Sequence, residues 1–299
     1  MTQIKEPLQK NKTSKPFERV LVRQRRGRAQ KKFGERFLYM RCVDDVVERV
    51  LDVRKNFDRT LLIGALNATQ LVADRLGAKL GHVTFADNTA YISGLDIVCD
   101  EEALPFKPGS FDLVVNLLTL HGVNQVPQAL AKIRTVLKPD GLFLAALFGG
   151  ETLGTLRHTL YAVEDQLYGR VSPRVASMIR LDQAASLLSA SGYTMPVADR
   201  DVVDVNYSSL DKLYKDLRLM GETNVLSARA PNPVSSRFFQ MVEALYTCDH
   251  STKFGKLKVR FEIIWLTGWA PHPNQPKPLK PGSATTKLAV ALGVQEEKL

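Results

Sequence analysis

The sequence lacks most features that would assign it to a specialised class of protein. Its three cysteines, Cys42, Cys99 and Cys248, are far apart and form neither a CxxC pair nor a Cys/His zinc pattern, which argues against a disulfide framework or a zinc module. No stretch approaches the roughly 20 apolar residues of a membrane-spanning helix. The N-terminus is too polar for a secretory signal. What remains is an ordinary globular composition, with free thiols typical of a reducing compartment.

Acidic residues are scarce only at the N-terminus. The 299-residue chain has a formal net charge of +10, and residues 1–32 carry eleven Lys and Arg against two Glu. The other 267 residues carry thirty basic and twenty-nine acidic side chains, so the body is nearly neutral and no nucleic-acid partner is expected. We expect a cytoplasmic location. Because an Arg-rich, acid-poor arm is also typical of organelle presequences, the mitochondrial matrix is the alternative.

Three regions are expected along the chain. Residues 1–41 form a basic arm that begins disordered and becomes helical from Phe17. Residues 42–270 form the main domain, with a helical insertion at about 208–250. Residues 271–299 form a proline-rich tail with no regular structure expected.

The arm and the segment after it both have helical periodicity. The second segment repeats valine at helical spacing, which predicts one apolar face, at Val43, Val46, Val47 and Val50. The arm instead carries a basic face, at Arg23, Arg25, Arg26 and Arg28. Such a face is either solvated or in contact with an acidic partner or RNA.

Strand-like and helix-like segments alternate through the main domain. Short apolar runs predict buried strands at 59–64, 82–87, 95–100, 111–118 and 142–148, with later strands near 197–206 and 259–269. Amphipathic patterns predict helices between them, including 69–80 and 126–137. This alternation predicts an α/β fold, a parallel sheet with helices on both faces.

Polar residues follow three of the expected strands. Gly64 to Asn67 end the first strand, Asp87 ends the second, and Asp100 and Glu101 end the third. In an open parallel sheet, ligands bind at the carboxyl ends of strands, where an acid accepts hydrogen bonds from ribose hydroxyls. These acids are also common in solvated turns, so both interpretations stay open.

The middle of the chain resembles class I S-adenosylmethionine-dependent methyltransferases. The string "LPFKPGSFDLVVNLLTLHGVNQVPQALAKIRTVLKPDG" carries this resemblance, and within the class it is similar to the malonyl-carrier-protein methyltransferase group of biotin synthesis. Further strings, "PFERVLVRQRRGRA", "GGETLGTLR", "VNYSSLDKLYKDLRLMGETN" and "GWAPHPNQPKP", resemble the respiratory complex I assembly factor 5 family. The second resemblance extends from about Phe17 to Thr286.

The resemblance implies a fold, a cofactor and a partner. The fold is Rossmann-like, with a seven-stranded, mostly parallel sheet. The cofactor is S-adenosylmethionine, and the residues expected to hold it are Gly64, Asn67, Asp87, Asp100, Glu101 and Asn116. The partner is a protein client, a subunit of respiratory complex I, because the mitochondrial members are associated with arginine hydroxylation on such a subunit. The oligomeric state is not predicted.

The glycine loop departs from the methyltransferase pattern, in which an acid precedes a glycine-rich turn. Leu62 occupies the position of the acid, while Leu66 and Ala68 replace the second and third glycines. A leucine side chain intrudes where the backbone should approach the cofactor. Gly122 stands where relatives carry Trp, which alters the pocket wall. Whether the cofactor binds is therefore open.

His121 is the best-placed candidate base, with Asn116 near it; the alternative is a structural histidine. Two loops supply polar groups that we expect either to cap the pocket or to pack locally, namely Glu222, Asn224, His272 and Gln275. Weaker candidates for substrate contacts are Arg157, His158 and Tyr207. None of the five histidines is followed by Asp or Glu two residues later, so no 2-His-1-carboxylate metal site is expected.

Two hypotheses follow. In the first, the chain is an enzyme of methyltransferase type that acts on a protein side chain. In the second, it is a non-catalytic assembly factor that kept the fold and the client surface, as the degraded loop at Leu62 and Leu66 suggests. A nucleic-acid methyltransferase ranks last, because it rests on the basic arm alone.

Overall fold

A seven-stranded sheet forms the centre of the computed structural model, which describes residues 15–31, 36–64 and 68–276. The predicted disorder at the start of the arm, most of the proline-rich tail, and Asn67 lie outside the described residues. The strand order is β3-β2-β1-β4-β5-β7-β6, with β7 antiparallel to both its neighbours and the other pairs parallel. The strands are β1 (Phe57–Gly64), β2 (Leu80–Asp87), β3 (Ile97–Val98), β4 (Phe111–Leu117), β5 (Leu137–Phe148), β6 (Thr194–Tyr207) and β7 (Leu257–Trp269). The mostly parallel sheet that the sequence predicts is therefore confirmed.

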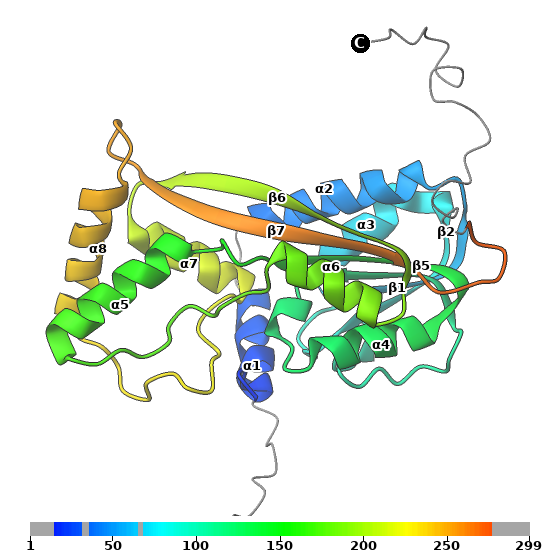
Figure 1. Cartoon of the computed structure of the whole chain (residues 1–299), viewed down its shortest axis with the longest axis horizontal. Helices are drawn as coiled ribbons and strands as arrows, with labels where there is room; N and C mark the ends of the chain where they lie inside the picture. The colour runs from blue at the N-terminus through cyan, green and yellow to red at the C-terminus, as the bar shows by residue number, and fades with distance from the viewer. Residues whose placement is uncertain (1–14, 32–35, 65–67, 277–299) are drawn as a thin grey trace, which may run out of the picture.

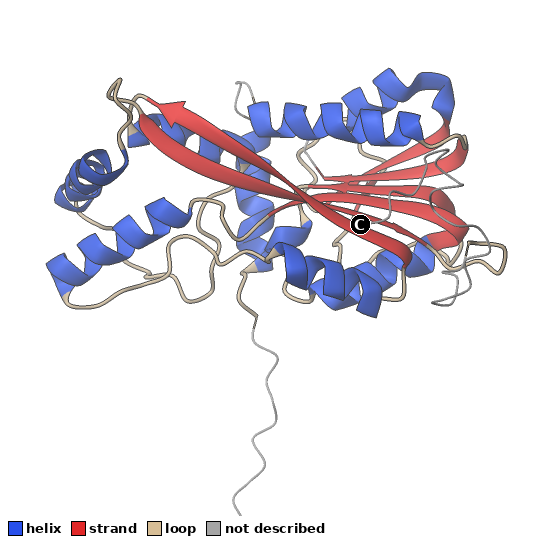
Figure 2. Ribbon diagram, turned by 45° about the horizontal axis from the view of Figure 1, so that its top comes forward, coloured by secondary structure: helices blue, strands red, loops and turns tan. Residues whose placement is uncertain are grey.

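Helices cover both faces of this sheet (Figure 2). On one face α2 and α3 pack over β1. The side chain of Leu62 in β1 lies in one apolar cluster with the buried residues of these two helices. On the other face α4 and α6 pack over Leu61 and Ile63. The two clusters explain why the central strands read as continuous apolar runs: their side chains are buried on both sides. The helices are α1 (Arg19–Gln30), α2 (Phe37–Asp52), α3 (Ala68–Leu76), α4 (Val126–Val136), α5 (Gly154–Tyr168), α6 (Leu181–Ala190), α7 (Leu210–Met220) and α8 (Ser236–His250).

The valine stripe predicted on the second helical segment forms the buried face of α2, and all four valines are nearly inaccessible to water. The third predicted strand is shorter than expected, because only Ile97 and Val98 pair with β2 at the sheet edge. Among the described residues, no helix combines the length and apolarity needed to cross a bilayer.

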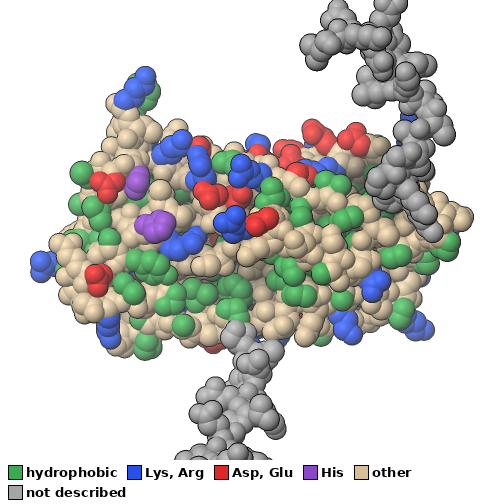
Figure 3. Space-filling model, viewed as in Figure 1, with side chains coloured by type: hydrophobic (Ala, Val, Ile, Leu, Met, Phe, Trp, Pro, Cys, Tyr) green, Lys and Arg blue, Asp and Glu red, His purple; other side chains and the backbone are tan. Residues whose placement is uncertain are grey.

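Strands β6 and β7 are longer than the parallel strands and project beyond their carboxyl ends (Figure 1). Helices α5, α7 and α8 pack around this projection, so they form a helical layer next to the edge where ligands bind in open α/β sheets. The outer strand β6 carries paired charges that protect a sheet edge from association. Figure 3 shows charges of both signs gathered on this part of the surface. Arg49 of α2 bonds to Asp199 of β6, and Arg260 of β7 bonds to Asp204 of β6.

Helix α1 lies across the same carboxyl edge, next to α7 (Figure 1). Its N-terminal end is held by Asn124, whose side chain accepts from the Phe17 amide at 2.8 Å and donates to the Phe17 carbonyl at 3.1 Å. The preceding turn pairs with the segment after α7, since the Glu18 amide donates to the Val225 carbonyl at 2.9 Å. Residues 15–31 of the basic arm therefore pack against the main domain.

Because one face of α2 packs in the core, we expect two leucines on this helix to differ in how much they contribute to the free energy of unfolding. Leu38 is fully buried and Leu51 is 54% exposed. Leu38→Ala should lower the free energy of unfolding by about 2–5 kcal/mol, because it leaves a cavity. Leu51→Ala should change it by less than about 0.5 kcal/mol. Urea unfolding followed by circular dichroism measures both values, and equal effects would contradict this packing of α2.

Candidate functional site

The carboxylates that follow β2 and β3 lie close together at the carboxyl edge of the sheet. Asp87 and Glu101 are fully buried, and the side chain of Asp100 is 16% exposed. At the end of β1, Gly64 has a φ of +86°, and a Cβ there would lie 2.2 Å from the Thr119 side chain. Only glycine fits that turn, so the first glycine of the loop is kept for steric reasons.

These carboxylates are paired with arginines of α1. The Arg26 guanidinium donates to Asp87 at 2.7 Å, and both side chains are almost completely buried. Arg19 donates to Asp100 at 2.9 Å and to Glu101, and its Nη1 donates to the Gly122 carbonyl at 2.8 Å. All three acids expected to contact a cofactor thus face a cation of the same chain.

The pairing shifts the proton affinities of these groups. Burial alone would lower the pKa of Arg26, but the Asp87 carboxylate outweighs it and the net shift is upward. Burial alone would raise the pKa of Asp100. The hydrogen bonds from Arg19, from the Glu102 amide and from Arg23 outweigh burial and lower this pKa. Both shifts favour the charged forms.

Several buried polar atoms beside α1 have no hydrogen-bond partner among the described residues. They are both amide atoms of Asn88, the amide nitrogen of Asn116 and one carboxylate oxygen of Glu101. Asn116 uses only its oxygen, which accepts from the Thr119 hydroxyl at 2.9 Å. Buried polar groups are rarely left unpaired, so unused hydrogen-bonding capacity at this edge is a sign of a ligand.

The basic face of α1 was expected to be solvated or to contact an acidic partner or RNA, and this expectation is wrong for Arg26. That side chain points into the protein and is 3% exposed, whereas Arg28 is exposed. The arginines that pair with the acids, Arg19, Arg23 and Arg26, follow one another at spacings of four and three residues and so lie on one helical face. That spacing, together with three acids after predicted strands, is the signal that sequence reasoning missed.

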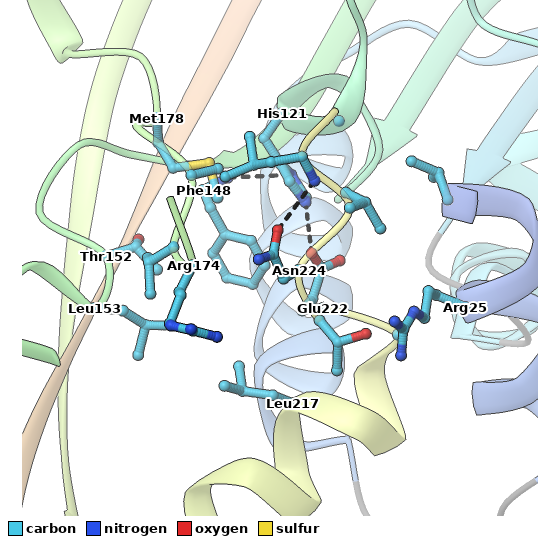
Figure 4. A pocket seen from close by; sticks show the side chains of 18 of the residues that line it. Arg25, His121, Phe148, Thr152, Leu153, Arg174, Met178, Leu217, Glu222 and Asn224 are labelled. Carbon is cyan, nitrogen blue, oxygen red and sulfur yellow. Dashed lines mark hydrogen bonds and ion pairs between the residues drawn. The ribbon is translucent and has the colours of Figure 1, made fainter. Parts of the chain in front are cut away.

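A cavity of about 410 Å³ lies next to this cluster, between α1, the ends of β4 and β5, and the helical layer. Figure 4 shows its lining, which is mostly apolar and includes Phe148, Leu153 and Leu217. One acidic side chain, Glu222, also lines it, together with four arginines, Arg25, Arg26, Arg174 and Arg218. The charge of Arg174 is matched by Glu164 at 2.7 Å, whose pKa is lowered because hydrogen bonds from Arg174 and Ser172 outweigh the burial that would raise it.

Glu222 and His121 form a hydrogen-bonded pair in the cavity wall. The imidazole Nε2 lies 3.0 Å from the Glu222 carboxylate, and the His121 side chain is 6% exposed. The other ring nitrogen, Nδ1, accepts from the Phe148 amide at 3.5 Å, so the neutral tautomer that fits donates Nε2–H to Glu222. The Tyr39 hydroxyl also donates to Glu222, at 3.4 Å. Both ring nitrogens of His121 are then engaged, so the imidazole holds the Glu222 carboxylate in the cavity wall.

The remaining candidates are divided among separate places. Asn224 lines the cavity, and its amide donates to the Pro173 carbonyl at 3.0 Å. Arg157 and His158 line a second cavity of about 750 Å³ on the far side of α5. Tyr207 is buried in the main apolar cluster at the end of β6. Neither Arg157 nor Tyr207 therefore reaches the His121–Glu222 pair.

His272 and Gln275 do not cap the cavity. Gln275 donates to Asp140 at 3.0 Å and to the Ala270 carbonyl, and its side-chain oxygen accepts from the His272 amide. Because β7 is antiparallel, its C-terminal end lies at the edge where β5 begins, opposite the cavity. This loop packs locally, which corrects the expectation that it covers the pocket. Among residues 15–31, 36–64 and 68–276, no group of three His, Cys, Asp or Glu could hold a metal ion.

Comparison with known proteins identifies the family. A methyltransferase domain model matches residues 62–145. The chain is 33% identical over 254 residues to the mitochondrial arginine-hydroxylase NDUFAF5 of Danio rerio, covering 82% of this chain and 78% of that protein. It is also 33% identical over 252 residues to the human protein of the same name, covering 81% and 72%. The chain belongs to the arginine-hydroxylase NDUFAF5 family.

The chain is also similar to a methyltransferase. The malonyl-acyl-carrier-protein O-methyltransferase of Xylella fastidiosa is 30% identical over 172 residues, covering 58% of this chain and 56% of that enzyme. The matched methyltransferase segment contains Asp87, Asp100, Glu101 and His121 but neither α1 nor Glu222. The parts that pair with these acids and with His121 therefore lie outside the shared domain.

In this arrangement the site does not fit S-adenosylmethionine. A ribose would need the Asp87 carboxylate that Arg26 occupies, and an adenine amine would need the carboxylates that Arg19 occupies. Leu62 lies in the apolar core and offers no charge to the methionyl ammonium. The orphaned amides of Asn88 and Asn116 match a polar ligand, but the carboxylates beside them are already paired.

The lowered pKa of Asp100 predicts a pH-dependent contribution to stability. A depressed folded-state pKa contributes fully above the unfolded pKa of about 4, and the contribution disappears as the pH falls through the folded value. Asp100→Asn should therefore cost about 1–3 kcal/mol of unfolding free energy at pH 7. The cost should vanish toward the folded pKa.

Urea unfolding of both proteins between pH 3 and pH 7, on the scale where unperturbed Asp titrates near ~4, measures this convergence. Asp74→Asn, at an exposed position on α3, is the control and should show no such pH-dependent difference. A difference between wild type and Asp100→Asn that stays constant with pH would contradict the paired geometry.

Proposed function

We propose that this chain modifies an arginine side chain of a client protein, and that the client is a subunit of respiratory complex I. Arginine is proposed as the target side chain because the relatives are named arginine-hydroxylases. A complex I subunit is proposed as the client because the sequence resembles the complex I assembly factor 5 family. The observation that carries the proposal is the His121–Glu222 pair in the wall of a mostly apolar cavity. The cavity lies at the carboxyl ends of β4 and β5, where open α/β sheets bind their ligands.

The cavity offers a guanidinium one carboxylate, that of Glu222, although arginines also line it. Glu222 presents a carboxylate among apolar side chains such as Phe148 and Leu217. Carboxylate–guanidinium pairs are strong and directional, and a low-dielectric surrounding strengthens them. His121 donates its Nε2–H to the same carboxylate and so fixes the orientation in which Glu222 would meet a guanidinium. Arg174 cannot take this place without leaving Glu164.

S-adenosylmethionine is the cofactor that we propose for the adjoining edge, with Asp87, Asp100, Glu101 and Asn116 as its contacts. The methyltransferase domain match and the orphaned amides of Asn88 and Asn116 support this assignment. The arginines of α1 hold the same acids, so the cofactor requires a different position of α1.

The second candidate is a non-catalytic assembly factor that binds the client without modifying it. Two observations favour it: Leu62 removes the acid of the cofactor loop, and α1 pairs with the remaining acids. Under this alternative the cavity serves only to hold a client side chain.

Mass spectrometry of a client subunit distinguishes the two candidates. The purified chain is incubated with the client and S-adenosylmethionine, and the client is digested and sequenced. A methyl group added to an arginine supports a methyltransferase. An added oxygen atom, in a parallel incubation that also contains molecular oxygen and a two-electron reductant, supports a hydroxylase. A client that binds stably and returns unmodified supports the assembly factor instead.

Glu222→Gln keeps the size of the side chain and removes its charge. We expect it to weaken client binding or lower the modification rate at least tenfold, a loss of about 1.4 kcal/mol. The matched control is His272→Ala at the opposite edge of the sheet, which should leave both unchanged. Thermal melts of both variants test for misfolding. If Glu222→Gln binds and modifies the client as the wild type does, the cavity has no part in the proposed function.

A further inference from the structure

We propose that α1 and a nucleoside cofactor are alternative occupants of one site, and that cofactor entry displaces α1 and opens the client cavity. This inference rests on the cofactor assignment made above and adds a regulatory step to it. The common site consists of Asp87, Asn88, Asp100, Glu101 and Asn116. Arg26 and Arg19 are its internal ligands.

The first argument is the overlap of partners. Arg26 takes both oxygens of Asp87, with Nε and Nη2 as donors, and Arg19 contacts both Asp100 and Glu101. These are the groups that ribose hydroxyls and a purine amine would use. A carboxylate in this geometry cannot serve both a guanidinium and a ribose diol. Occupation by one therefore excludes the other.

The second argument is that α1 satisfies the site incompletely. Within the described residues, Asn88 keeps both amide atoms unpaired at 3% exposure, and Asn116 and Glu101 each keep one polar atom unpaired. An arginine offers only donors, so it cannot pair the Asn88 or Asn116 amide nitrogens. A nucleoside offers donors and acceptors on both ribose and base. The leftover atoms therefore match a nucleoside better than they match α1.

The third argument is steric. Gly27 of α1 faces Tyr91 and Thr89, and a Cβ at Gly27 would lie 2.4 Å from the Tyr91 ring and 3.0 Å from the Thr89 hydroxyl. The helix approaches the segment after β2 as closely as a glycine allows. A side chain at this position would push α1 away without altering any acid or arginine.

Release of α1 also affects the cavity. The turn before α1 pairs with the 225–229 segment, through the Glu18 amide on Val225 and an ion pair of 2.6 Å between Glu18 and Arg229. Gly221, just before Glu222, faces the Arg26 backbone closely, since a Cβ added at Gly221 would lie 3.2 Å from the Arg26 Cα. The same helix thus holds the cofactor acids and the cavity lining, so displacement couples cofactor binding to client access.

Two variants test the competition by different routes. Arg26→Gln removes the charge that pairs with Asp87, and Gly27→Val wedges α1 off the site while valine is no worse a helix former than glycine. Both should increase the fraction of molecules with an open site, and so tighten S-adenosylhomocysteine binding at least about tenfold in calorimetric titration. Arg28→Gln, the same chemical change at an exposed position of α1, is the control and should bind like wild type.

Amide hydrogen exchange gives a second readout on the unmodified protein. Saturating S-adenosylhomocysteine should accelerate exchange along residues 19–30, because the helix leaves its docking site. Greater protection of these amides would overturn the proposal, since α1 would then close over the cofactor. Weaker binding by Arg26→Gln would overturn it as well, because Arg26 would be a cofactor ligand.

The outcomes separate this inference from the proposed function. Tight wild-type binding that neither variant changes overturns the competition and leaves the cofactor assignment intact. Absence of binding in wild type and in both variants, up to millimolar cofactor, overturns both. Tightening in both variants with faster exchange of α1 is the expected result.

Discussion

The Arg26 guanidinium reaches Asp87 across the carboxyl edge of the sheet, and neither side chain retains contact with water. Such a pair adds little stability over an apolar one, yet removing one partner leaves a buried charge that costs several kcal/mol, about 3–5. Either both groups stay together or each must find another partner. The position of α1 is therefore tied to whatever else can satisfy Asp87.

That constraint extends to the helical layer, because α1 sits between the strand ends and the segment after α7. The long antiparallel pair β6–β7 carries α5, α7 and α8 beyond the parallel strands, which creates the cavity. Its floor is built from the ends of β4 and β5 and its wall from the 221–226 segment. Since α1 contacts that wall and the acids, the two halves of the site share one structural element.

Local sequence patterns predicted the fold, but they could not predict which side chains far apart in the chain would pair. The valines of α2 recur at helical spacing whatever they pack against, so their burial could be read from the sequence. The burial of Arg26 depends on Asp87, 61 residues away, and the contact of His121 depends on Glu222, 101 residues away. A basic helical face looks the same in sequence whether water or carboxylates cover it. Gln275 lies at the edge of the sheet opposite the cavity because β7 is antiparallel to β5. An apolar strand pattern in the sequence does not indicate the direction of the strand.

The departures in the glycine loop and the arginines of α1 concern different halves of the candidate cofactor site. Leu62, which replaces the acid of the methyltransferase pattern, lies in β1. The acids after β2 and β3 are intact, and they are the ones that α1 pairs with. Three carboxylates gathered at a buried edge repel one another unless cations or hydrogen-bond donors face them. Their burial therefore requires such a partner, and in this structure α1 provides it.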